Sequence, residues 1–522
     1  MSNKGGTAEA RAFRPYFGDG LLFFILKNRG DSMIYPDLER FKRLAEESER
    51  IPISLEMEGD TETPISLFKK LCSQKDSYLL ESIEGGVKWG RYSYIGRKPF
   101  MKIICYGQEA VLCKGEQRIF QKGKALDIVK ACMEELRIGV LDNMPDFHGG
   151  AVGYFGYDLI RDYEELPDIN QDDMDIPDVC LLFTEEVIVY DHVKQKIKVI
   201  LNQAVEEDVE KAYKAGRERL YQIQKEIVDN GFSSVEITED DSPEVSYQST
   251  ETKESFMKKV KKAKGYIRDG DIFQVVLSQR LRIETKMNPF EAYRSLRSLN
   301  PSPYMYYFDF GDYRIAGSSP ELLVKVKAGQ IETCPIAGTR PRGEDKEEDE
   351  AYAQELLKDE KELAEHLMLV DLARNDIGKV SDFGTVEVNQ YMEIQRYSHV
   401  MHIVSNVIGK LRAELDMYHG LVACLPAGTV SGAPKVRAME IIDELETTKR
   451  GLYAGAVGYL GFNGNMDMCI AIRTILFKEN KAYIQAGAGI VADSDPEKEY
   501  EETLRKAEAL VETIRQAKER LK

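Results

Sequence analysis

Two glutamates stand three positions apart at the start of the apolar run "KELAEHLMLVDLARND", residues 361–376. On a helix, Glu362 and Glu365 would be neighbours on one side, together with His366 and Leu369. The apolar residues that follow point in every direction, which predicts a buried helix. Buried carboxylates need a proton, a base or a metal to neutralise them. The alternative is a solvated first turn favoured by the helix dipole, and this stretch alone does not separate the two.

A second pair of glutamates has the same spacing. Glu499 and Glu502 follow a strand-like segment and a predicted helix start, with Asp495 as the N-cap and Pro496 at the first position. Four carboxylates on two helices would suit a hard cation such as Mg²⁺, which prefers oxygen ligands. Taken alone, the second pair lies off the apolar stripe of its helix, so its periodicity favours a solvated surface.

Loops of small residues lie before and between these helices in the sequence. "PIAGTRPRG" (335–343) places two arginines after a glycine and a threonine, and "LPAGTVSGAPK" (425–435) precedes a predicted helix starting near Pro434. The N-terminus of such a helix can bind an anion. With Gly487 and Gly489 ending a strand, these loops have the features of a carboxylate-binding pocket.

The pattern of helical and strand-like segments indicates an α+β fold with largely antiparallel sheets. The regular β-α-β alternation of a doubly wound fold is missing. A helical pattern begins at Met33. The strand-like "GAVGYFGY" (150–157) is repeated as "GAVGYLGF" (455–462), which suggests similar strands in two halves of the chain. The predicted parts are an irregular extension at 1–32, an N-terminal domain at 33–229, a polar linker at 230–254 and a second domain at 255–522.

Composition excludes several classes of function. The chain has 522 residues, which is too long for one ordinary core, and its net charge of −18 argues against nucleic acid or an anionic membrane as a partner. The apolar run at 21–26 is too short for a signal peptide or a membrane span. The eight cysteines are scattered without a C-x-x-C pattern, which predicts free thiols in a reducing, cytoplasmic compartment.

Four motifs, "PIAGTRPRG", "AEHLMLVDLARND", "PAGTVSGAPK" and "GAGIVADSDPEKEYEET", in this order resemble the chorismate-utilising enzymes. The first half is similar to one branch, the large subunits of the anthranilate synthases, over 78–96 and 149–167. Long motifs in the same order over roughly 450 residues are more specific than any short pattern. The resemblance implies the α+β fold of that family.

The resemblance implies Mg²⁺ between the two glutamate pairs, with Glu365 and Glu502 as direct ligands and Glu362 and Glu499 as supporting or water-mediated ligands. The ion would hold the ring carboxylate of chorismate. An arginine inside the apolar run "CIAIRTILF" needs an anion, which this substrate would supply. The residues matching family positions around the substrate are Gly338, Thr339, Thr429, Tyr453, Arg473, Gly487, Gly489 and Lys506.

Two residues match the family's proton-transfer groups. Glu321 in "GSSPELLV" matches the general acid that protonates the departing C4 hydroxyl of chorismate, although its local pattern is that of a carboxylate at a helix start. His402 in "YSHVMHIVSNV" matches the histidine tied to loss of the enolpyruvyl group as pyruvate. A lone histidine in an apolar run is otherwise a core residue, and His399 remains an alternative if the segment is a helix turned differently.

The branches of this family differ in the nucleophile that attacks chorismate. Isochorismate and salicylate synthases carry a lysine where this chain has Gln274, and a neutral amide cannot activate water as that base can. Aminodeoxychorismate synthases often carry a lysine where this chain has Ala337. The implied reaction converts chorismate and ammonia to anthranilate and pyruvate, the first step of tryptophan biosynthesis. The alternatives are an aminodeoxychorismate synthase of the folate pathway and a catalytically silent regulatory subunit.

The chain lacks a glutaminase nucleophile motif. The resemblance therefore implies that ammonia comes from solution or from a separate glutamine amidotransferase subunit, in a heterotetramer with two chains of each kind.

In the anthranilate synthases the element at 78–96 contributes to a pocket for feedback inhibition by L-tryptophan. On pattern alone, Glu81 and Ser82 form a strand edge before a glycine turn. Chemically, Glu81 can accept a hydrogen bond from an α-ammonium group and Ser82 can bind a polar group. The resemblance adds Asn300, Pro301, Pro303, Tyr304, Met305, Val457 and Tyr459 to this effector pocket.

Overall fold

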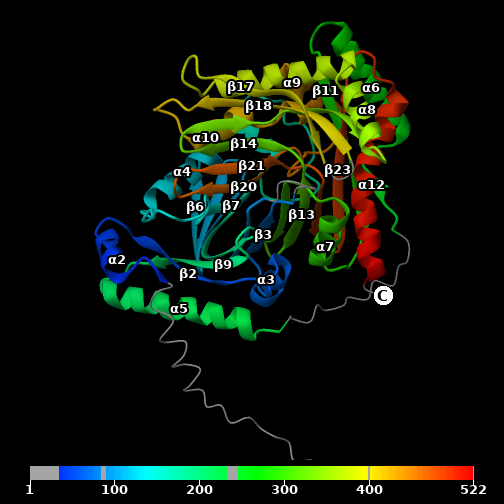
Figure 1. Ribbon diagram of the computed structural model, residues 1–522. Helices are drawn as coiled ribbons and strands as arrows, with labels where there is room; N and C mark the ends of the chain where they lie inside the picture. The colour runs from blue at the N-terminus through cyan, green and yellow to red at the C-terminus, as the bar shows by residue number, and fades with distance from the viewer. Residues whose placement is uncertain (1–33, 84–89, 232–244, 398–399, 521–522) are drawn as a thin grey trace, which may run out of the picture.

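The computed structural model describes residues 34–83, 90–231, 245–397 and 400–520. The predicted extension, most of the predicted linker and His399 lie outside the described residues, so the domain boundaries remain predictions. The α+β class is confirmed, because the named strands pair antiparallel throughout the described chain and helices cover the sheets (Figure 1). None of the described helices has the length and apolar character needed to cross a membrane.

Two long strands, β4 (Tyr92–Tyr106) and β8 (Val179–Asp191), pair along their whole length and link two sheets. The first sheet continues from Tyr92–Arg97 and Glu186–Asp191, and the second from the other ends of the same strands. In order, the first sheet contains β2 (Arg50–Glu58), β9 (Lys196–Ala204), β8, β4, β3 (Ser77–Glu81), β12 (Tyr304–Asp309), β13 (Tyr313–Ser319), β22 (Thr474–Lys478), β23 (Lys481–Ile490) and β11 (Gln274–Glu284).

The second sheet passes through the two repeated segments seen in the sequence. In order it contains β6 (Gln117–Lys122), β5 (Glu109–Lys114), β4, β8, β7 (Gly150–Phe155), β20 (Ala456–Gly461), β21 (Met466–Ile470), β14 (Leu322–Lys327), β15 (Gln330–Thr333), β18 (Val400–Lys410) and β17 (Glu387–Arg396), with β16 (Ile336–Pro341) next to β15 along β18.

The repeated segments are β7 and β20, which pair directly with Gly153 opposite Gly458. A Cβ at Gly153 would stand 1.9 Å from the carbonyl oxygen of Cys180, and one at Gly458 would stand 2.0 Å from that of Asp467. Both positions therefore require glycine because a neighbouring backbone approaches closely, as the sequence pattern indicated.

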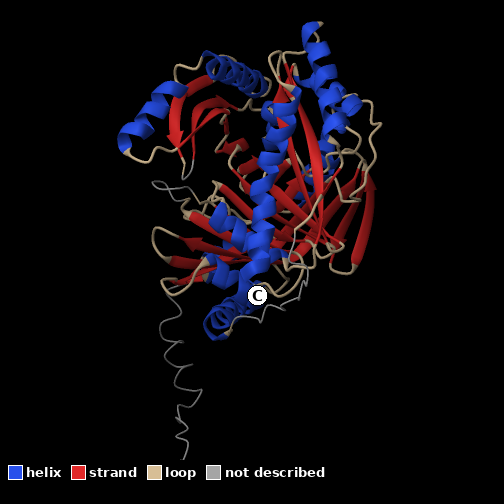
Figure 2. Ribbon diagram, turned by 90° about the vertical axis from the view of Figure 1, so that its right-hand side faces the viewer, coloured by secondary structure: helices blue, strands red, loops and turns tan. Residues whose placement is uncertain are grey.

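Helices cover the outer faces of the sheets, and an aromatic core that includes Tyr154, Tyr306 and Phe308 packs between them. Figure 1 shows α12 along β23, α5 below β2 and β9, and α9 above β17 and β18; Figure 2 shows α12 from the front, crossing the strands. The helices on the first sheet are α3 (Pro64–Leu71), α5 (Val209–Asp229), α7 (Pro289–Leu299) and α12 (Pro496–Arg520), and those on the second are α4 (Ala125–Glu135), α9 (Glu360–Gly378) and α10 (Met417–Cys424). The helices α6 (Lys253–Arg268) and α11 (Lys435–Leu445) pack on β11.

Two expectations about helices were wrong. The helix predicted from Met33 is instead the short strand β1 (Ile34–Tyr35), and α2 (Leu38–Ala45) begins after Asp37, whose carboxylate caps it. The helix α9 is not buried all round: Leu367 is 46% exposed, because the helix lies on the outside of the sheet and buries only one face.

Candidate active site

A cavity of about 240 Å³ opens where both sheets meet α9 and α12. It is lined from β11, the turn between β13 and β14, β16, β18 and β23, as well as from the two helices. Every residue predicted to transfer a proton or bind the substrate lines it: Gln274, Glu321, Gly338, Thr339, His402, Thr429, Tyr453, Arg473, Gly487, Gly489 and Lys506. Of the four predicted metal ligands, Glu365 lines the same cavity.

Glu321 lies in the turn between β13 and β14 and not at a helix start, which corrects the local sequence pattern. Its side chain is buried, and burial raises the pKa of the carboxyl group to about 7, against the opposing effects of Thr429, Arg473 and Lys506. A carboxyl group with this pKa is substantially protonated at neutral pH, so it can act as a general acid.

His402 lies in the strand β18 and not in a helix. Its Nδ1 is 2.7 Å from the carbonyl oxygen of Gly338 and 3.1 Å from the hydroxyl of Thr339. Because a carbonyl oxygen only accepts, Nδ1 carries the hydrogen and Nε2 is left to accept a proton. Burial and the charge of Arg473 lower the pKa of His402, so the imidazole is neutral at pH 7.

Arg473 follows β21 with a backbone φ of 49°, which is rare for a residue with a side chain. Among the described residues it donates one hydrogen bond, from NH1 to Asn300 Oδ1 at 3.4 Å. Burial lowers the pKa of its guanidinium group. A strained arginine with so little pairing is suited to receive an anion from outside the chain.

Gln274 begins β11 and turns its amide toward the cavity. Its Nε2 donates to Glu365 Oε1 at 3.4 Å, and its buried Oε1 has no partner among the residues described. Gly489 leaves the room for this side chain, because a Cβ there would lie 2.6 Å from Gln274 Nε2. Across β23, Lys506 donates to the carbonyl oxygen of Gly487 at 3.1 Å.

The two glutamate pairs lie at the starts of α9 and α12. Burial raises the pKa of Glu365 and the charge of Glu362 adds to this, while burial and then the charge of Glu502 raise that of Glu499. The ammonium group of Lys361 lowers the pKa of both Glu365 and Glu499. Glu365 on α9 and Glu499 on α12 are therefore close enough to share the influence of the same lysine.

The chain's own cations neutralise part of this acidic cluster. Glu502 forms an ion pair of 2.7 Å with Lys506, and Glu362 lies 3.7 Å from Arg340. Glu362 also borders the cavity wall, since its Oε2 would lie 3.3 Å from a Cβ on Gly338. In the part of the chain that the structure describes, no three acidic, histidine or cysteine side chains converge closely enough to hold a metal ion.

Residues 76–512 match the family of chorismate binding enzymes. The chain belongs to the chorismate binding enzyme family. It is 56% identical to anthranilate synthase component 1 of Acetivibrio thermocellus over 493 residues, covering 93% of this chain and 100% of the relative. It is 48% identical to the protein of that name in Aquifex aeolicus, covering 92% of this chain and 98% of the relative.

Solved structures agree with this family membership. Anthranilate synthase component I from Streptococcus pneumoniae is 42% identical to this chain. The TM-score is 0.72, with coverage of 87% of this chain and 98% of the other. The menaquinone-specific isochorismate synthase of Escherichia coli has a TM-score of 0.66 over 91% of this chain and 98% of the other. At 18% identity, the second likeness shows a shared fold only.

Of the residues predicted for the effector pocket, Tyr304 and Tyr459 pack in the same aromatic core. Met305 pairs with Glu81, and the hydroxyl of Tyr304 donates at 3.0 Å to Asp467, which lies opposite Tyr459. The remaining predicted positions are Ser82, Asn300, Pro301, Pro303 and Val457, while residues 84–89 of the predicted element lie outside the described residues.

Glu81 already has partners within the chain. The hydroxyl of Tyr293 donates to it at 2.6 Å, and Arg297 donates from Nε at 3.0 Å and from NH2 at 3.2 Å. Sequence reasoning missed both partners, which are more than 200 residues away and carry no local signal. It also missed Gln485 in the catalytic cavity, although the two-residue period of β23 places it on the same face as Gly487 and Gly489.

Proposed function

We propose that this chain is the synthase component of an anthranilate synthase, which converts chorismate and ammonia to anthranilate and pyruvate. One observation carries the proposal: a single cavity combines a protonated carboxyl group, Glu321, a neutral imidazole, His402, and a sparsely paired guanidinium, Arg473. The names of the relatives at 48% and 56% identity support the same reaction.

In the first half-reaction, Arg473 and Lys506 bind the carboxylates of chorismate and fix the ring. Glu321 donates its proton to the C4 hydroxyl as water leaves, while the lone pair of ammonia forms a bond to C2 and the ring double bonds shift. The nitrogen on C2, which then carries a positive charge, releases one proton to solvent and becomes an amino group. Gln274 has a neutral amide that can orient a nucleophile but cannot deprotonate water, which supports ammonia as the attacking group.

In the second half-reaction, the Nε2 atom of His402 removes the proton from C2. The electrons of that bond complete the aromatic ring as the C3–O bond breaks, and the released enolpyruvate takes up a proton to become pyruvate. The hydrogen bond from Nδ1 to Gly338 holds the tautomer that this step needs.

A divalent cation would find oxygen ligands at the helix starts, where burial and the charge of Glu362 raise the pKa of Glu365, and burial and the charge of Glu502 raise that of Glu499. We propose that Glu365 and Glu502 would hold Mg²⁺ directly, with Glu362 and Glu499 supporting it. Bound there, the ion would neutralise the ring carboxylate of chorismate. Isothermal calorimetry should detect Mg²⁺ binding that Glu365→Gln abolishes without lowering the melting temperature.

The name of the relatives, component 1, supports a second component. We propose a glutamine amidotransferase in a complex with two chains of each kind. The eight free thiols support the cytoplasm as the compartment.

We also propose that L-tryptophan binds beside Glu81 and inhibits the reaction. The contact between Asn300 and Arg473 offers a short route from that pocket to the substrate. Calorimetry should show tryptophan binding that Ser82→Phe removes, and by linkage chorismate should weaken it. The absence of binding to the pure chain would remove this part of the proposal.

The reaction itself is tested by incubating the pure chain with chorismate, Mg²⁺ and ammonium chloride and recording anthranilate fluorescence. We expect anthranilate with ammonium and none with glutamine until an amidotransferase is added. Formation of aminodeoxychorismate without anthranilate would identify the chain as an aminodeoxychorismate synthase. No reaction of chorismate would identify a catalytically silent subunit.

A further inference from the structure

The side chain of Arg450 lies directly behind the wall of the catalytic cavity. Arg450 is 1% exposed, and it is not among the described residues that line the cavity. It belongs to the loop that follows α11 and leads to Tyr453 and β20. The proposed mechanism gives this buried charge no chemical step.

Three segments of the cavity wall meet at this one group. NH1 of Arg450 donates to the carbonyl oxygen of Val430 at 2.6 Å, and NH2 donates to that of Val276 at 2.7 Å. The guanidinium also lies over the ring of Tyr453, 5.5 Å from its centroid. Val276, Val430 and Tyr453 all line the cavity. One side chain therefore fixes the spacing of wall segments that are distant in the sequence.

Two of these contacts lie next to residues predicted to act on the substrates. Val430 directly follows Thr429, and Val276 lies on β11 two residues after Gln274. Because a hydrogen bond to a backbone carbonyl fixes the backbone itself, it also restricts the side chains on either side. The guanidinium thus sets how far Thr429 and Gln274 lie from each other across the cavity.

The third contact leads to the groups predicted to bind carboxylates. The hydroxyl of Tyr453 lies against Gly487, where an added Cβ would stand 2.8 Å from it. The carbonyl oxygen of Gly487 in turn accepts from Lys506 at 3.1 Å. A displaced Tyr453 ring would therefore disturb the strand that Lys506 contacts.

Glu446 holds the guanidinium in one orientation. It accepts from Nε of Arg450 at 2.9 Å and from NH2 at 2.7 Å. Its Oε1 also accepts from the N–H of Ser278 at 2.8 Å and from the hydroxyl of Ser278 at 2.9 Å. Since Ser278 lies on β11, the pair of Arg450 and Glu446 anchors that strand at a second point.

Residues from the first half of the chain support the same loop from the other side. The ring centroid of Tyr157 lies 4.9 Å from the guanidinium of Arg450. The next residue, Gly451, donates its N–H to the carboxylate of Asp158 at 3.0 Å and accepts from the N–H of Tyr157 at 2.7 Å. Arg450 is therefore held on every side that faces away from the cavity wall.

The shape of the guanidinium explains why an arginine suits this position. A buried ion pair by itself stabilises a fold no more than well-packed neutral side chains do. A planar guanidinium can bond a carboxylate and two carbonyl oxygens at once in fixed directions, whereas an ammonium group cannot hold that geometry. The contacts therefore favour a role in spacing the cavity wall over one in strengthening the fold.

We infer that Arg450 is a positioning residue for chorismate, which sets the distances between the segments of Thr429, Gln274 and Tyr453 without touching the substrate. The inference rests on the proposed function, since chorismate must occupy the cavity. Loss of the guanidinium weakens chorismate binding even in molecules that fold normally.

The test measures the Kd of chorismate by calorimetry in the pure full-length chain with Mg²⁺ and without ammonia, so that no turnover is needed. Arg450→Lys keeps the positive charge beside Glu446 but cannot bond both carbonyl oxygens. We expect the Kd to rise about tenfold. Arg137→Lys is the matched control: Arg137 pairs with Glu49 at 2.8 Å on the surface, and its replacement should leave the Kd unchanged.

A double variant separates positioning from stability. Arg450→Met combined with Glu446→Gln removes both charges, so no unpaired buried charge remains, and its melting temperature should exceed that of Arg450→Met alone. The Kd of chorismate should still be about tenfold above that of the wild type, because the carbonyl oxygens of Val276 and Val430 have lost their shared donor.

A purely structural arginine would give a different result. In that case chorismate would bind to the folded double variant with the Kd of the wild type, and this outcome would overturn the inference. A wild-type Kd in folded Arg450→Lys would overturn it as well, and if Arg450→Lys does not fold, the double variant decides. A wild-type chain that binds no chorismate would instead refute the proposed function.

Discussion

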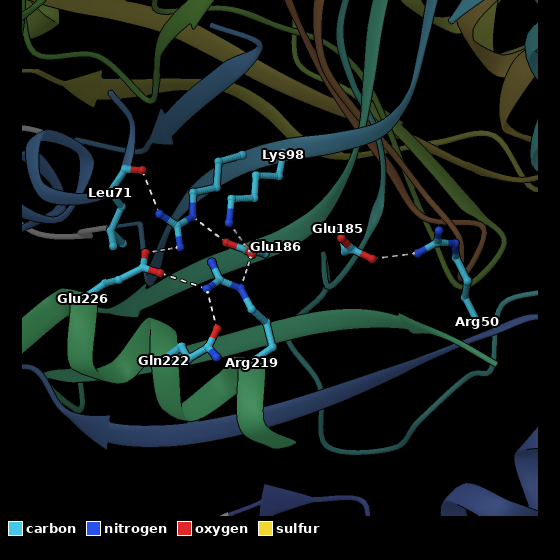
Figure 3. A network of polar contacts seen from close by, with 9 residues as sticks. Arg50, Leu71, Lys98, Glu185, Glu186, Arg219, Gln222 and Glu226 are labelled. Atoms are coloured by element: carbon cyan, nitrogen blue, oxygen red, sulfur yellow. Dashed lines mark hydrogen bonds and ion pairs between the residues drawn. The ribbon is translucent and has the colours of Figure 1, made fainter. Parts of the chain in front are cut away.

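Two buried groups of charges in this molecule are arranged in opposite ways. In the N-terminal half, Glu186 accepts from Arg97 at 2.5 Å and from Arg219 at 2.7 Å, with Lys98 at 3.3 Å. Figure 3 shows these contacts between strands and α5, together with the second carboxylate, Glu226, that Arg219 also reaches. Buried charges that are paired in this way fasten elements to one another.

In the catalytic cavity, Glu321 and Arg473 form no ion pair with each other. Arg473 donates one long hydrogen bond among the described residues, and it influences Glu321 without being close enough for an ion pair. The difference appears in the pKa values: that of Glu186 is lowered despite its burial, whereas that of Glu321 is raised to about 7. The ion pairs of Glu186 keep its carboxylate ionised, so that it can hold the fold together. The sparse pairing in the cavity leaves the proton of Glu321 and the charge of Arg473 available to a substrate.

The largest effect is expected from Glu321→Gln. The variant keeps the shape of the side chain and removes the acid, so kcat should fall about 10²–10⁴-fold. Its melting temperature at pH 8 should equal or exceed that of the wild type, because a buried carboxylate without an ion pair is removed. Stopped-flow fluorescence and calorimetry measure the two effects. A small loss of kcat would show that Glu321 belongs with the structural charges.

A smaller effect is expected from Arg473→Lys. An ammonium group preserves the charge but cannot form two parallel hydrogen bonds to a carboxylate. The KM for chorismate should rise about 10–100-fold with the KM for ammonia unchanged. Steady-state kinetics at fixed ammonium would measure it. Equal rises in both constants would contradict a role in binding chorismate.

The smallest effect on catalysis is expected from Glu186→Gln. Removing one partner of a buried charge network should lower the free energy of unfolding by about 3 kcal/mol, while kcat per folded molecule stays unchanged. The pKa of Glu186 is lowered, so its contribution is present above the ordinary glutamate value and is lost as the pH falls through the folded value.

Glu185→Gln is the matched control for this variant. The neighbouring Glu185 is 37% exposed in its side chain and lies 3.2 Å from Arg50, so its loss should cost less than about 1 kcal/mol. Urea unfolding at pH 7 measures both variants. Equal losses from the two would show that the buried network contributes no more than a surface ion pair.

The sequence predicted which residues line the catalytic cavity better than it predicted the helices, strands and turns that carry them. Glu321, His402 and Arg473 were found through motifs, yet Glu321 proved to lie in a turn and His402 in a strand. Local periodicity cannot separate these cases, because short apolar runs fit helices and strands equally. The burial of α9 was overestimated for a related reason: Leu367 is apolar but faces outward.

Contacts between distant segments could not be predicted. Arg297 meets Glu81 only because α7 packs beside β12, which pairs with β3, and the buried Arg280 on β11 pairs with Asp173, which is 107 residues away. The position of Gln485 in the cavity could have been predicted, because it alternates with Gly487 and Gly489 in the sequence and therefore shares their face of the strand.

The pH dependence of kcat with free ammonia held saturating tests most directly whether the sparsely paired carboxyl group is the acid. The pKa of Glu321 is about 7, so wild-type kcat should fall as the pH rises through that value, because the protonated form is required. Glu321→Gln should have a low kcat that is flat over the same range. A wild-type kcat that is constant from pH 6 to 9, or a falling limb that persists in Glu321→Gln, would contradict the account.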